Sequence, residues 1–202
     1  MQVRLSASDL ACRRGDRVLF SGLNIDLSAG QALQIEGANG IGKTSLLRIL
    51  AGLLRPYSGT VDNHGEIGLL DERPGLDPEL TVRKALGFWE RVDGCNDPRG
   101  AILAMGLEPL LDVPVRFLST GQRKRAALAS LLNRDVKIWL LDEPLSGLDA
   151  RAIQQVTALI ALHIGGGGLA VIASHQPVEL QALETLQLAD YVPHHEIEDE
   201  PA

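Results

Sequence analysis

The chain has few cysteines and no apolar run long enough for a membrane-spanning helix. Its two cysteines among 202 residues, Cys12 and Cys95, form no CxxC pair and no Cys/His cluster. This usage is typical of reduced thiols in a cytosolic protein. A disulfide between the two cysteines is the alternative. A helix across a bilayer needs about 20 consecutive apolar residues. The stretch 159–176 lacks Asp, Glu, Lys and Arg, but its two histidines and four consecutive glycines exclude a single span.

Positive charge and aromatic residues are also scarce. The formal net charge is −7, and only 3% of the residues are aromatic. Phosphate contacts to nucleic acid require a concentrated basic face, so this balance argues against a nucleic-acid partner. The N-terminus has no basic start followed by an apolar run, so no secretory signal is expected. A chain of this length can bury its own core, and we expect a single domain over residues 1–202.

The order of the apolar segments indicates an α/β fold. Short strand-like segments dominate the first third, and buried strands without alternation follow at 138–141 and 169–173. Helices are expected between these strands, and one more after the last of them. Such a pattern indicates a parallel sheet that is covered on both faces. Residues 73–117 hold five of the ten prolines and helical segments at 82–92 and 98–105, which indicates an inserted helical subdomain.

The most specific motif is a glycine-rich loop between a strand and a helix. It matches the pattern G-x-x-x-x-G-K-[ST] and consists of Gly37, Ala38, Asn39, Gly40, Ile41, Gly42, Lys43 and Thr44, followed by Ser45. Its glycines let backbone N–H groups face a phosphate, and the helix N-terminus adds a positive dipole. We expect Lys43 to neutralise the β- and γ-phosphates and the Thr44 hydroxyl to bind Mg²⁺. The alternative is a chance glycine turn before a helix.

A second motif is a pair of carboxylates, Asp142 and Glu143, at the end of the buried strand 138–141. Open α/β sheets bind ligands at the carboxyl ends of their strands, so this pair should lie beside the phosphate loop. Asp142 is expected to hold Mg²⁺ and Glu143 to orient and polarise the attacking water. Without the loop, an Asp-Glu pair after a strand is often only a solvated helix start.

Three further segments complete an ordered set of motifs. They are Leu118-Ser119-Thr120-Gly121-Gln122, then Ser146-Gly147-Leu148-Asp149, and Ser174-His175 at the end of the second buried strand. With the loop and the carboxylates, they resemble the signature, D-loop and switch histidine of ABC-type ATPases, with Thr120 in place of the usual glycine. Simpler interpretations exist: Ser119 or Thr120 could cap a helix, and His175 could make a structural hydrogen bond at a strand end.

The resemblance covers essentially the whole chain and implies a P-loop NTPase of ABC type that binds ATP and Mg²⁺. It implies a mostly parallel sheet core, an N-terminal antiparallel β part and the helical insertion. It also implies a homodimer in the ATP-bound state, with each ATP between one chain's loop and the other chain's signature. The signature residues Ser119, Thr120, Gly121 and Gln122 would then face the partner's ATP, and Asp149 would belong to the D-loop. Lys43, Glu143 and His175 would be catalytic, with His175 near Glu143 and the γ-phosphate.

Two positions depart from the family pattern. Where most ABC domains have an aromatic residue that stacks on adenine, this chain has Cys12-Arg13-Arg14-Gly15, so Arg14 could stack its guanidinium on the base or the contact could be weak. The glutamine that usually precedes the helical subdomain is replaced, by alignment, with Glu72. A carboxylate there could bind Mg²⁺ directly, but it adds negative charge beside ATP.

The helical segment resembles one subgroup of the family, the ATP-binding subunit of the haem exporter in bacterial cytochrome c maturation. The resemblance rests on Pro74-Gly75-Leu76, Glu79-Leu80-Thr81 and Phe88-Trp89. It implies a peripheral subunit on the cytoplasmic face of the inner membrane, attached to separate integral-membrane permease subunits and without direct haem binding. The alternatives are the ATPase of another ABC importer or exporter, a soluble ABC ATPase that acts on ribosomes or nucleic acid, and a regulator that no longer hydrolyses ATP.

Overall fold

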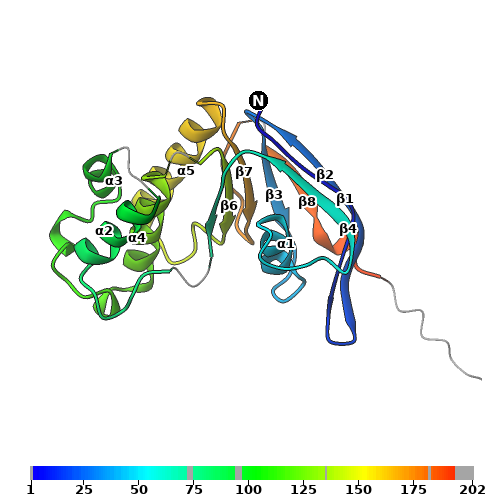
Figure 1. Ribbon diagram of the computed structural model, residues 1–202, viewed down its shortest axis with the longest axis horizontal. Coiled ribbons are helices and arrows are strands. Elements are labelled where there is room, and N and C mark those ends of the chain that lie inside the picture. The colour runs from blue at the N-terminus through cyan, green and yellow to red at the C-terminus, as the bar shows by residue number, and fades with distance from the viewer. Residues whose placement is uncertain (1, 72–74, 94–96, 135, 182, 194–202) are drawn as a thin grey trace, which may run out of the picture.

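The structure is a computed structural model that describes residues 2–71, 75–93, 97–134, 136–181 and 183–193. Its strands are β1 (Arg4–Arg14), β2 (Arg17–Ser28), β3 (Ala32–Glu36), β4 (Ser58–His64), β5 (Ile67–Leu70), β6 (Ile138–Asp142), β7 (Leu169–Ala173) and β8 (Leu183–Gln187). Its α-helices are α1 (Lys43–Leu50), α2 (Val82–Asp93), α3 (Pro98–Ala104), α4 (Thr120–Leu132) and α5 (Ala150–Gly165). Short 3-10 helices cover Glu108–Leu110, Val115–Phe117 and Leu188–Tyr191. Figure 1 shows helices α2, α3 and α4 at one end of the molecule and the antiparallel strands at the other.

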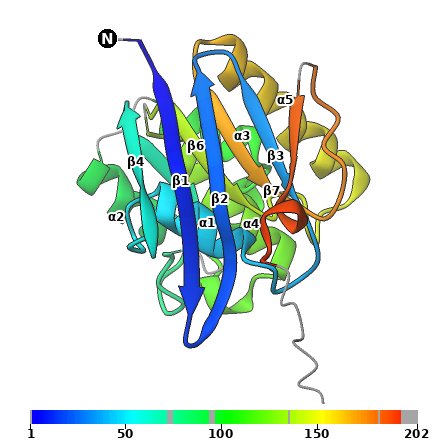
Figure 2. The ribbon, with the colours of Figure 1, turned by 90° about the vertical axis from the view of Figure 1, so that its right-hand side faces the viewer.

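The N-terminal strands form an antiparallel sheet in the order β2-β1-β4, which Figure 2 shows face on. Leu5 and Ala7 of β1 alternate with more exposed residues, so one face of this sheet packs into the core. The register shifts after Ala7, where Asp9 adopts a positive φ of 50°. Gly59 faces this bulge, and a Cβ there would lie 2.4 Å from the Asp9 carbonyl oxygen. Only glycine therefore allows β4 to approach β1 at this point.

The second sheet has the order β5-β6-β7-β3-β8, and all of its pairings are parallel. Strands β6 and β7 are buried along their whole length, as expected for uninterrupted apolar strands covered on both faces. The two sheets confirm the predicted class, an α/β fold with a mostly parallel core and an N-terminal antiparallel part.

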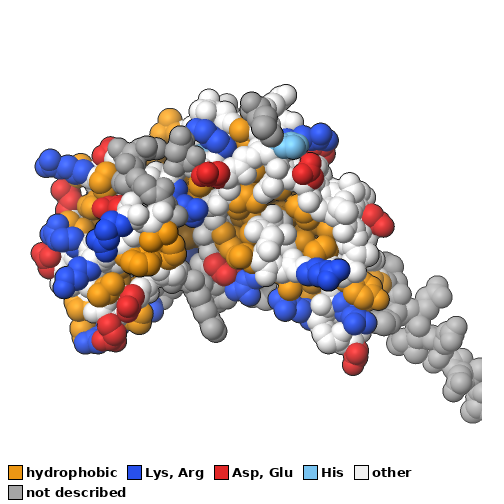
Figure 3. Space-filling model, in the orientation of Figure 1, with side chains coloured by type: hydrophobic (Ala, Val, Ile, Leu, Met, Phe, Trp, Pro, Cys, Tyr) orange, Lys and Arg blue, Asp and Glu red, His pale blue; other side chains and the backbone are white. Residues whose placement is uncertain are grey.

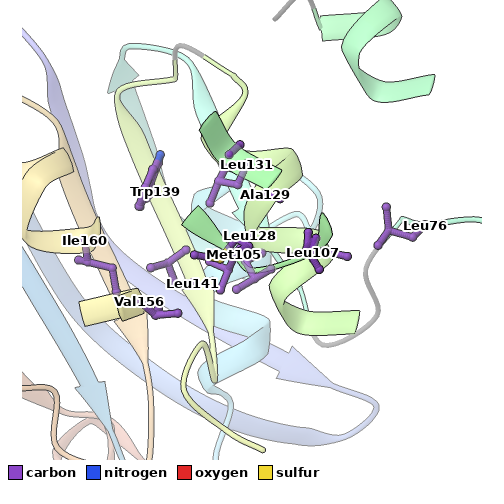
Figure 4. Packing of buried hydrophobic residues seen from close by; sticks show 14 of the residues in the cluster. Leu76, Met105, Leu107, Leu128, Ala129, Leu131, Trp139, Leu141, Val156 and Ile160 are labelled. Atoms are coloured by element: carbon purple, nitrogen blue, oxygen red, sulfur yellow. The ribbon is translucent and has the colours of Figure 1, made fainter. Parts of the chain in front are cut away.

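Helices and the antiparallel sheet cover the two faces of the parallel sheet. On one face, α1 lies between the two sheets, and its Leu46 and Leu50 join a core cluster with residues of β1, β2, β3, β6 and β7. On the other face, α4 and α5 pack on the sheet. Figure 4 shows Val156 and Ile160 of α5 beside Leu141 of β6, with Leu128 of α4 in the same cluster. This packing holds the carboxyl ends of β3, β6 and β7 in fixed positions beside α1 and α4.

The inserted segment contains the helices that the sequence predicts. The predicted helices 82–92 and 98–105 correspond to α2 and α3, and the described part of the segment contains no strand, only an isolated bridge between Thr81 and Pro114. Near this bridge, the amide of Val82 donates to the carbonyl of Val113, so the residues before α2 and those near the end of the segment lie side by side. Met105 and Leu107, which follow α3, pack with Leu128 of α4, which Figure 4 also shows. The insertion is thus joined to the helix that carries the signature.

One predicted element is wrong. The sequence predicts an α-helix after β7, but the described residues there form the strand β8 and a 3-10 helix at Leu188–Tyr191. β8 pairs in parallel with β3, from Ala32 opposite Leu183 to Glu36 opposite Gln187. Leu183 and Leu186 have helical spacing, but β3 offers an open sheet edge, and pairing with it outweighs the local preference.

Two smaller expectations concern the cysteines and the membrane. Cys12 is a buried free thiol, and burial raises its pKa. Cys95 and the acidic tail 196–200 lie outside the described residues. In the part of the chain that the structure describes, no helix is both long and apolar enough to cross a membrane.

Candidate functional site

A cavity of about 1090 Å³ lies at the carboxyl ends of β3, β6 and β7. Eleven predicted site residues line it: Arg14, Asn39, Gly40, Gly42, Lys43, Thr44, Ser45, Thr120, Asp142, Glu143 and His175. Gly37, Ala38, Ile41, Ser119, Gly121, Gln122 and Asp149 are not among its lining residues. Glu72 lies outside the described residues, so its predicted role stays a prediction.

The glycine-rich loop connects β3 to α1 in a conformation that needs its glycines. Gly37, Gly40 and Gly42 have φ values of 147°, 78° and 126°, which other residues rarely adopt. Gly42 is the N-cap of α1 and, having no side chain, supplies no side-chain cap. The start of α1 therefore lines the cavity with no side-chain cap on its first N–H groups, an arrangement suited to an anion.

Lys43 lies at the base of this loop with 7% of its side chain exposed. Its ammonium donates to the carbonyls of Gly37 at 2.6 Å and Ala38 at 3.4 Å. It also lies 4.0 Å from Oε1 of Glu143. The buried charge is thus held by the loop at the point where the loop's N–H groups would meet a phosphate.

Thr44 and Asp142 provide adjacent oxygen atoms at the start of α1 and the end of β6. The Thr44 hydroxyl donates to Oδ2 of Asp142 at 2.7 Å, and Asp142 is only 3% exposed. A hydroxyl and a carboxylate beside a phosphate-binding loop fit the oxygen-rich, partly hydrated coordination that Mg²⁺ prefers. These two residues, 98 positions apart in sequence, therefore form a donor set that fits this ion.

Glu143 is held by three contacts at once. Its amide donates to the carbonyl of Ala173 in β7 at 2.8 Å, and the ammonium of Lys124 in α4 donates to its carbonyl. Oε2 of its carboxylate lies 2.8 Å from Nδ1 of His175, which matches the predicted proximity of these two side chains. Glu143 has a left-handed φ of 47°, uncommon for a residue with a side chain. A carboxylate fixed in this way can accept a hydrogen bond from a water molecule in the cavity.

Gln34, which the sequence analysis did not single out, shapes the segment that carries His175. This side chain of β3 is 2% exposed; its amide nitrogen donates to the carbonyl of Gln176 and its oxygen accepts from the amide of Val178. The Ser174 hydroxyl also donates to the Gln176 carbonyl, at 2.8 Å. The sequence did contain a signal for this role: Gln34 stands inside an otherwise apolar strand, and a buried amide needs polar partners.

The signature segment begins α4 and makes the contacts that the capping interpretation predicts. The Ser119 hydroxyl accepts from the amide of Gln122, and the Gln122 side chain accepts from the amide of Ser119. A Cβ on Gly121 would lie 2.6 Å from the carbonyl oxygen of Gly147, so the signature and the D-loop are in close contact. Asp149 caps α5 through the amide of Ala152. Capping does not exclude a second role, since Ser119 and Thr120 are exposed to solvent.

The cavity is strongly cationic although the chain is acidic. Six of its lining side chains are basic, namely Arg14, Arg17, Lys43, Arg116, Arg123 and Lys124, and two are acidic, Asp142 and Glu143. On the face that Figure 3 shows, by contrast, basic and acidic side chains are interspersed among hydrophobic ones. The sequence analysis missed Arg17, Arg116, Arg123 and Lys124, because only the fold brings them together. The cavity is therefore suited to a polyanion.

Comparison with known proteins agrees with this geometry. A family model described as "ABC transporter" matches residues 20–146. The "Cytochrome c biogenesis ATP-binding export protein CcmA" of Novosphingobium aromaticivorans is 52% identical over 189 residues, 94% of this chain and 97% of that protein. The protein of the same name from Zymomonas mobilis is 46% identical, over 94% of this chain and 86% of that protein.

Solved structures show the same fold. A putative ABC transporter ATP-binding protein from Pyrococcus furiosus has a TM-score of 0.81 at 24% identity, covering 94% of this chain and 100% of that one. A putative metal-chelate type ABC transporter in an inward-facing conformation has a TM-score of 0.77 at 27% identity, covering 92% of this chain and 80% of that one.

The fold and the cationic cavity at the phosphate loop define a nucleotide-binding domain of ABC type. The chain belongs to the ABC transporter family and, within it, groups with the CcmA proteins. Its activity is ATP hydrolysis coupled to transport.

Proposed function

We propose that the chain is the ATP-hydrolysing subunit of a transporter complex that energises haem export or delivery for c-type cytochrome biogenesis. The names of its relatives support the biosynthetic process, and the residues of the helical segment support the same subgroup. The observation that carries the hydrolytic part is the convergence of Lys43, Asp142 and Glu143 on one cavity. The alternative is the ATPase of another ABC importer or exporter, which the same cavity would serve.

In the proposed mechanism, each cavity residue has a separate task. The loop N–H groups and Lys43 would bind the β- and γ-phosphates, and Thr44 and Asp142 would hold Mg²⁺, which would supply charge neutralisation at the phosphates. Glu143 accepts a hydrogen bond from the attacking water and orients it toward the γ-phosphorus. His175 hydrogen-bonds the Glu143 carboxylate and thereby fixes its direction. Arg14, an exposed residue that lines the cavity, would stack its guanidinium on the base.

Replacing Lys43 by Ala tests the phosphate-binding role. Without the ammonium, the γ-phosphate loses its main counter-charge, so we expect ATPase turnover to fall at least about 100-fold, as for other preorganised charge contacts. Phosphate release by the purified chain measures this. The matched control is Lys84→Met, which removes an exposed lysine of α2 outside the cavity. Unchanged turnover in Lys43→Ala would contradict the role given to the loop.

We further propose that two copies of the chain bind ATP head to tail, with the signature residues Ser119 to Gln122 on the partner's ATP. Exposure of the N-terminal end of α4 supports this arrangement, because a capped but accessible helix start can meet a phosphate from another chain. Within each copy, residues 1–202 form one ATP-binding domain with a helical subdomain at about 73–117. Release of the γ-phosphate then opens the dimer.

The dimer would dock on separate integral-membrane permease subunits at the cytoplasmic face of the inner membrane, and those subunits would handle haem. A solved relative, "cbiO1 from clostridium perfringens", is described as part of the ABC transporter complex cbiONQ, which supports a multi-subunit assembly. Purifying the tagged chain from its own membranes and identifying the bound proteins tests this. Subunits of cytochrome c assembly are the expected result, and an unrelated permease would contradict the haem assignment while leaving the ATPase in place.

A further inference from the structure

Lys124 connects the signature helix to the residue that we propose polarises water. It lies in the second turn of α4, five positions after the Ser119 cap, and lines the cavity. Its ammonium donates to the backbone carbonyl of Glu143, which directly follows β6. The contact therefore crosses from the helical part of the chain to the end of the parallel sheet.

The contact with Lys124 helps to hold the backbone of Glu143 in an unfavourable conformation. Its φ of 47° lies in the left-handed region, where a residue with a Cβ is disfavoured unless its surroundings hold it there. The amide side of the residue is held by the Ala173 carbonyl of β7 at 2.8 Å. The carbonyl side is held by Lys124. Rotation of this backbone would swing the carboxylate away from its present partners.

Those partners define the working direction of the carboxylate. One oxygen lies 2.8 Å from Nδ1 of His175, and the other lies 4.0 Å from the ammonium of Lys43. The side chain of Glu143 is 25% exposed, so it can still reach a water molecule in the cavity. Its direction thus depends on a backbone conformation that the sheet and α4 fix from opposite sides.

Lys43 and Lys124 have different partners in the same cavity. Lys43 donates to the loop carbonyls of Gly37 and Ala38, at the phosphate-binding end. Lys124 donates to the carbonyl of the residue that carries the carboxylate. Loss of Lys43 should therefore weaken nucleotide binding, whereas loss of Lys124 should affect the step that needs Glu143 in place.

We infer that Lys124 is a positioning residue: it holds the left-handed backbone of Glu143 and so links the placement of α4 to the hydrolytic competence of the same chain. The inference rests on the proposed role of Glu143 in ATP hydrolysis. Because α4 begins with the signature, a displacement of this helix would reach Glu143 of the same chain through the Lys124 hydrogen bond.

Four variants of the full chain test this inference. Lys124→Met removes the hydrogen bond and keeps the aliphatic length, Lys124→Arg keeps a donor, Lys84→Met is the matched control on α2, and Glu143→Gln is the reference for lost hydrolysis. For each, steady-state ATPase kinetics give kcat and KM, a fluorescent ATP analogue gives the binding constant, and thermal unfolding checks the fold. A charged hydrogen bond of this kind is lost in Lys124→Met, so kcat should fall roughly tenfold or more.

The expected pattern separates positioning from nucleotide contact and from folding. In Lys124→Met, kcat falls while KM and the binding constant change less than about twofold, because the phosphate contacts are untouched. Lys124→Arg recovers most of the lost kcat, and Lys84→Met resembles the unmodified chain. A fold defect would lower the melting temperature of Lys124→Met. If Lys124→Arg has the same melting temperature as Lys124→Met but recovers kcat, the result still supports positioning.

Two outcomes overturn the inference while the proposed function stands. One is an unchanged kcat in Lys124→Met together with loss of hydrolysis in Glu143→Gln. The other is weaker ATP binding in Lys124→Met with unchanged kcat, which makes Lys124 a phosphate contact. The proposed function itself fails in a different way, if the unmodified chain does not hydrolyse ATP or if Glu143→Gln hydrolyses it normally.

Discussion

At the scale of single residues, the site depends on polar groups whose partners come from distant parts of the chain. Thr44 and Asp142 meet across 98 positions, and Glu143 and His175 across 32. The sequence could predict all four, because each occupies a motif position whose chemistry is local and recognisable. Gln34 and Lys124 were missed: a glutamine in an apolar strand signals buried polar partners without identifying them, and the partner of Lys124 is a backbone carbonyl that no sequence pattern identifies.

A second residue-scale feature lies away from the cavity, where His163 of α5 stacks on Trp139 of β6. The two rings are 3.9 Å apart between centroids and 8° from parallel, and Nε2 of His163 lies 3.3 Å from the carbonyl oxygen of Leu169. Burial lowers the pKa of His163, against the opposing effect of its backbone hydrogen bonds, and the positive charge of Lys137 lowers it further. The folded chain therefore disfavours the charged imidazole.

This shift predicts a pH dependence of stability. Below pH about 6.5 the unfolded chain takes up a proton at His163 that the folded chain does not, so stability is lost as the pH falls toward the lowered pKa. Replacing His163 by Gln should reduce this loss, because glutamine does not titrate. Urea unfolding of both proteins at pH 7.5 and pH 5.5 measures the difference. Equal losses of unfolding free energy in the two proteins would contradict the shift.

At the scale of elements, helix starts combine structural and functional roles. Ser119 and Gln122 form a capping box at α4, and the same residues are proposed to meet the partner's ATP. Asp97 caps α3 in a similar way, through the amide of Gly100, but lies outside the cavity lining. Comparing the two caps therefore separates the capping role of Ser119 from its proposed contact with ATP.

Replacing each cap by Ala should have the same effect on stability and different effects on activity. Ser119→Ala and Asp97→Ala each lose a cap and should lower the free energy of unfolding by about 1 kcal/mol. Only Ser119→Ala should also lower ATPase turnover, by roughly tenfold, because it removes the hydroxyl that is proposed to contact the partner's phosphate. Denaturant unfolding and phosphate release measure the two effects. Equal turnover in both variants would mean that Ser119 is only a cap.

Element predictions from the sequence succeeded where a local signal and the fold agree. The buried strands β6 and β7 have uninterrupted apolar sequences and were predicted within a residue of their ends. The segment that forms β8 was expected to be helical, because helices alternate with the buried strands before it, and only the free edge of β3 selects a strand there. Edge pairing is a tertiary effect, so periodicity alone could not find it.

At the scale of the whole molecule, positive charge is concentrated in the cavity beside the glycine-rich loop. The chain has a net charge of −7, yet six basic and two acidic side chains line the cavity. Composition argued against nucleic acid, but it could not reveal a local cationic site for ATP, because the basic residues come from β1, β2, α1, α4 and the segment before α4.

The central claim is that two copies bind ATP between the loop of one chain and the signature of the other. The most direct measurement is light scattering on the Glu143→Gln variant after size-exclusion chromatography, with ATP and Mg²⁺ or with ADP. Without water activation the bound ATP persists, so the variant should elute at twice the mass of one chain with ATP and at the mass of one chain with ADP. A variant that binds ATP and remains a monomer would contradict the composite site.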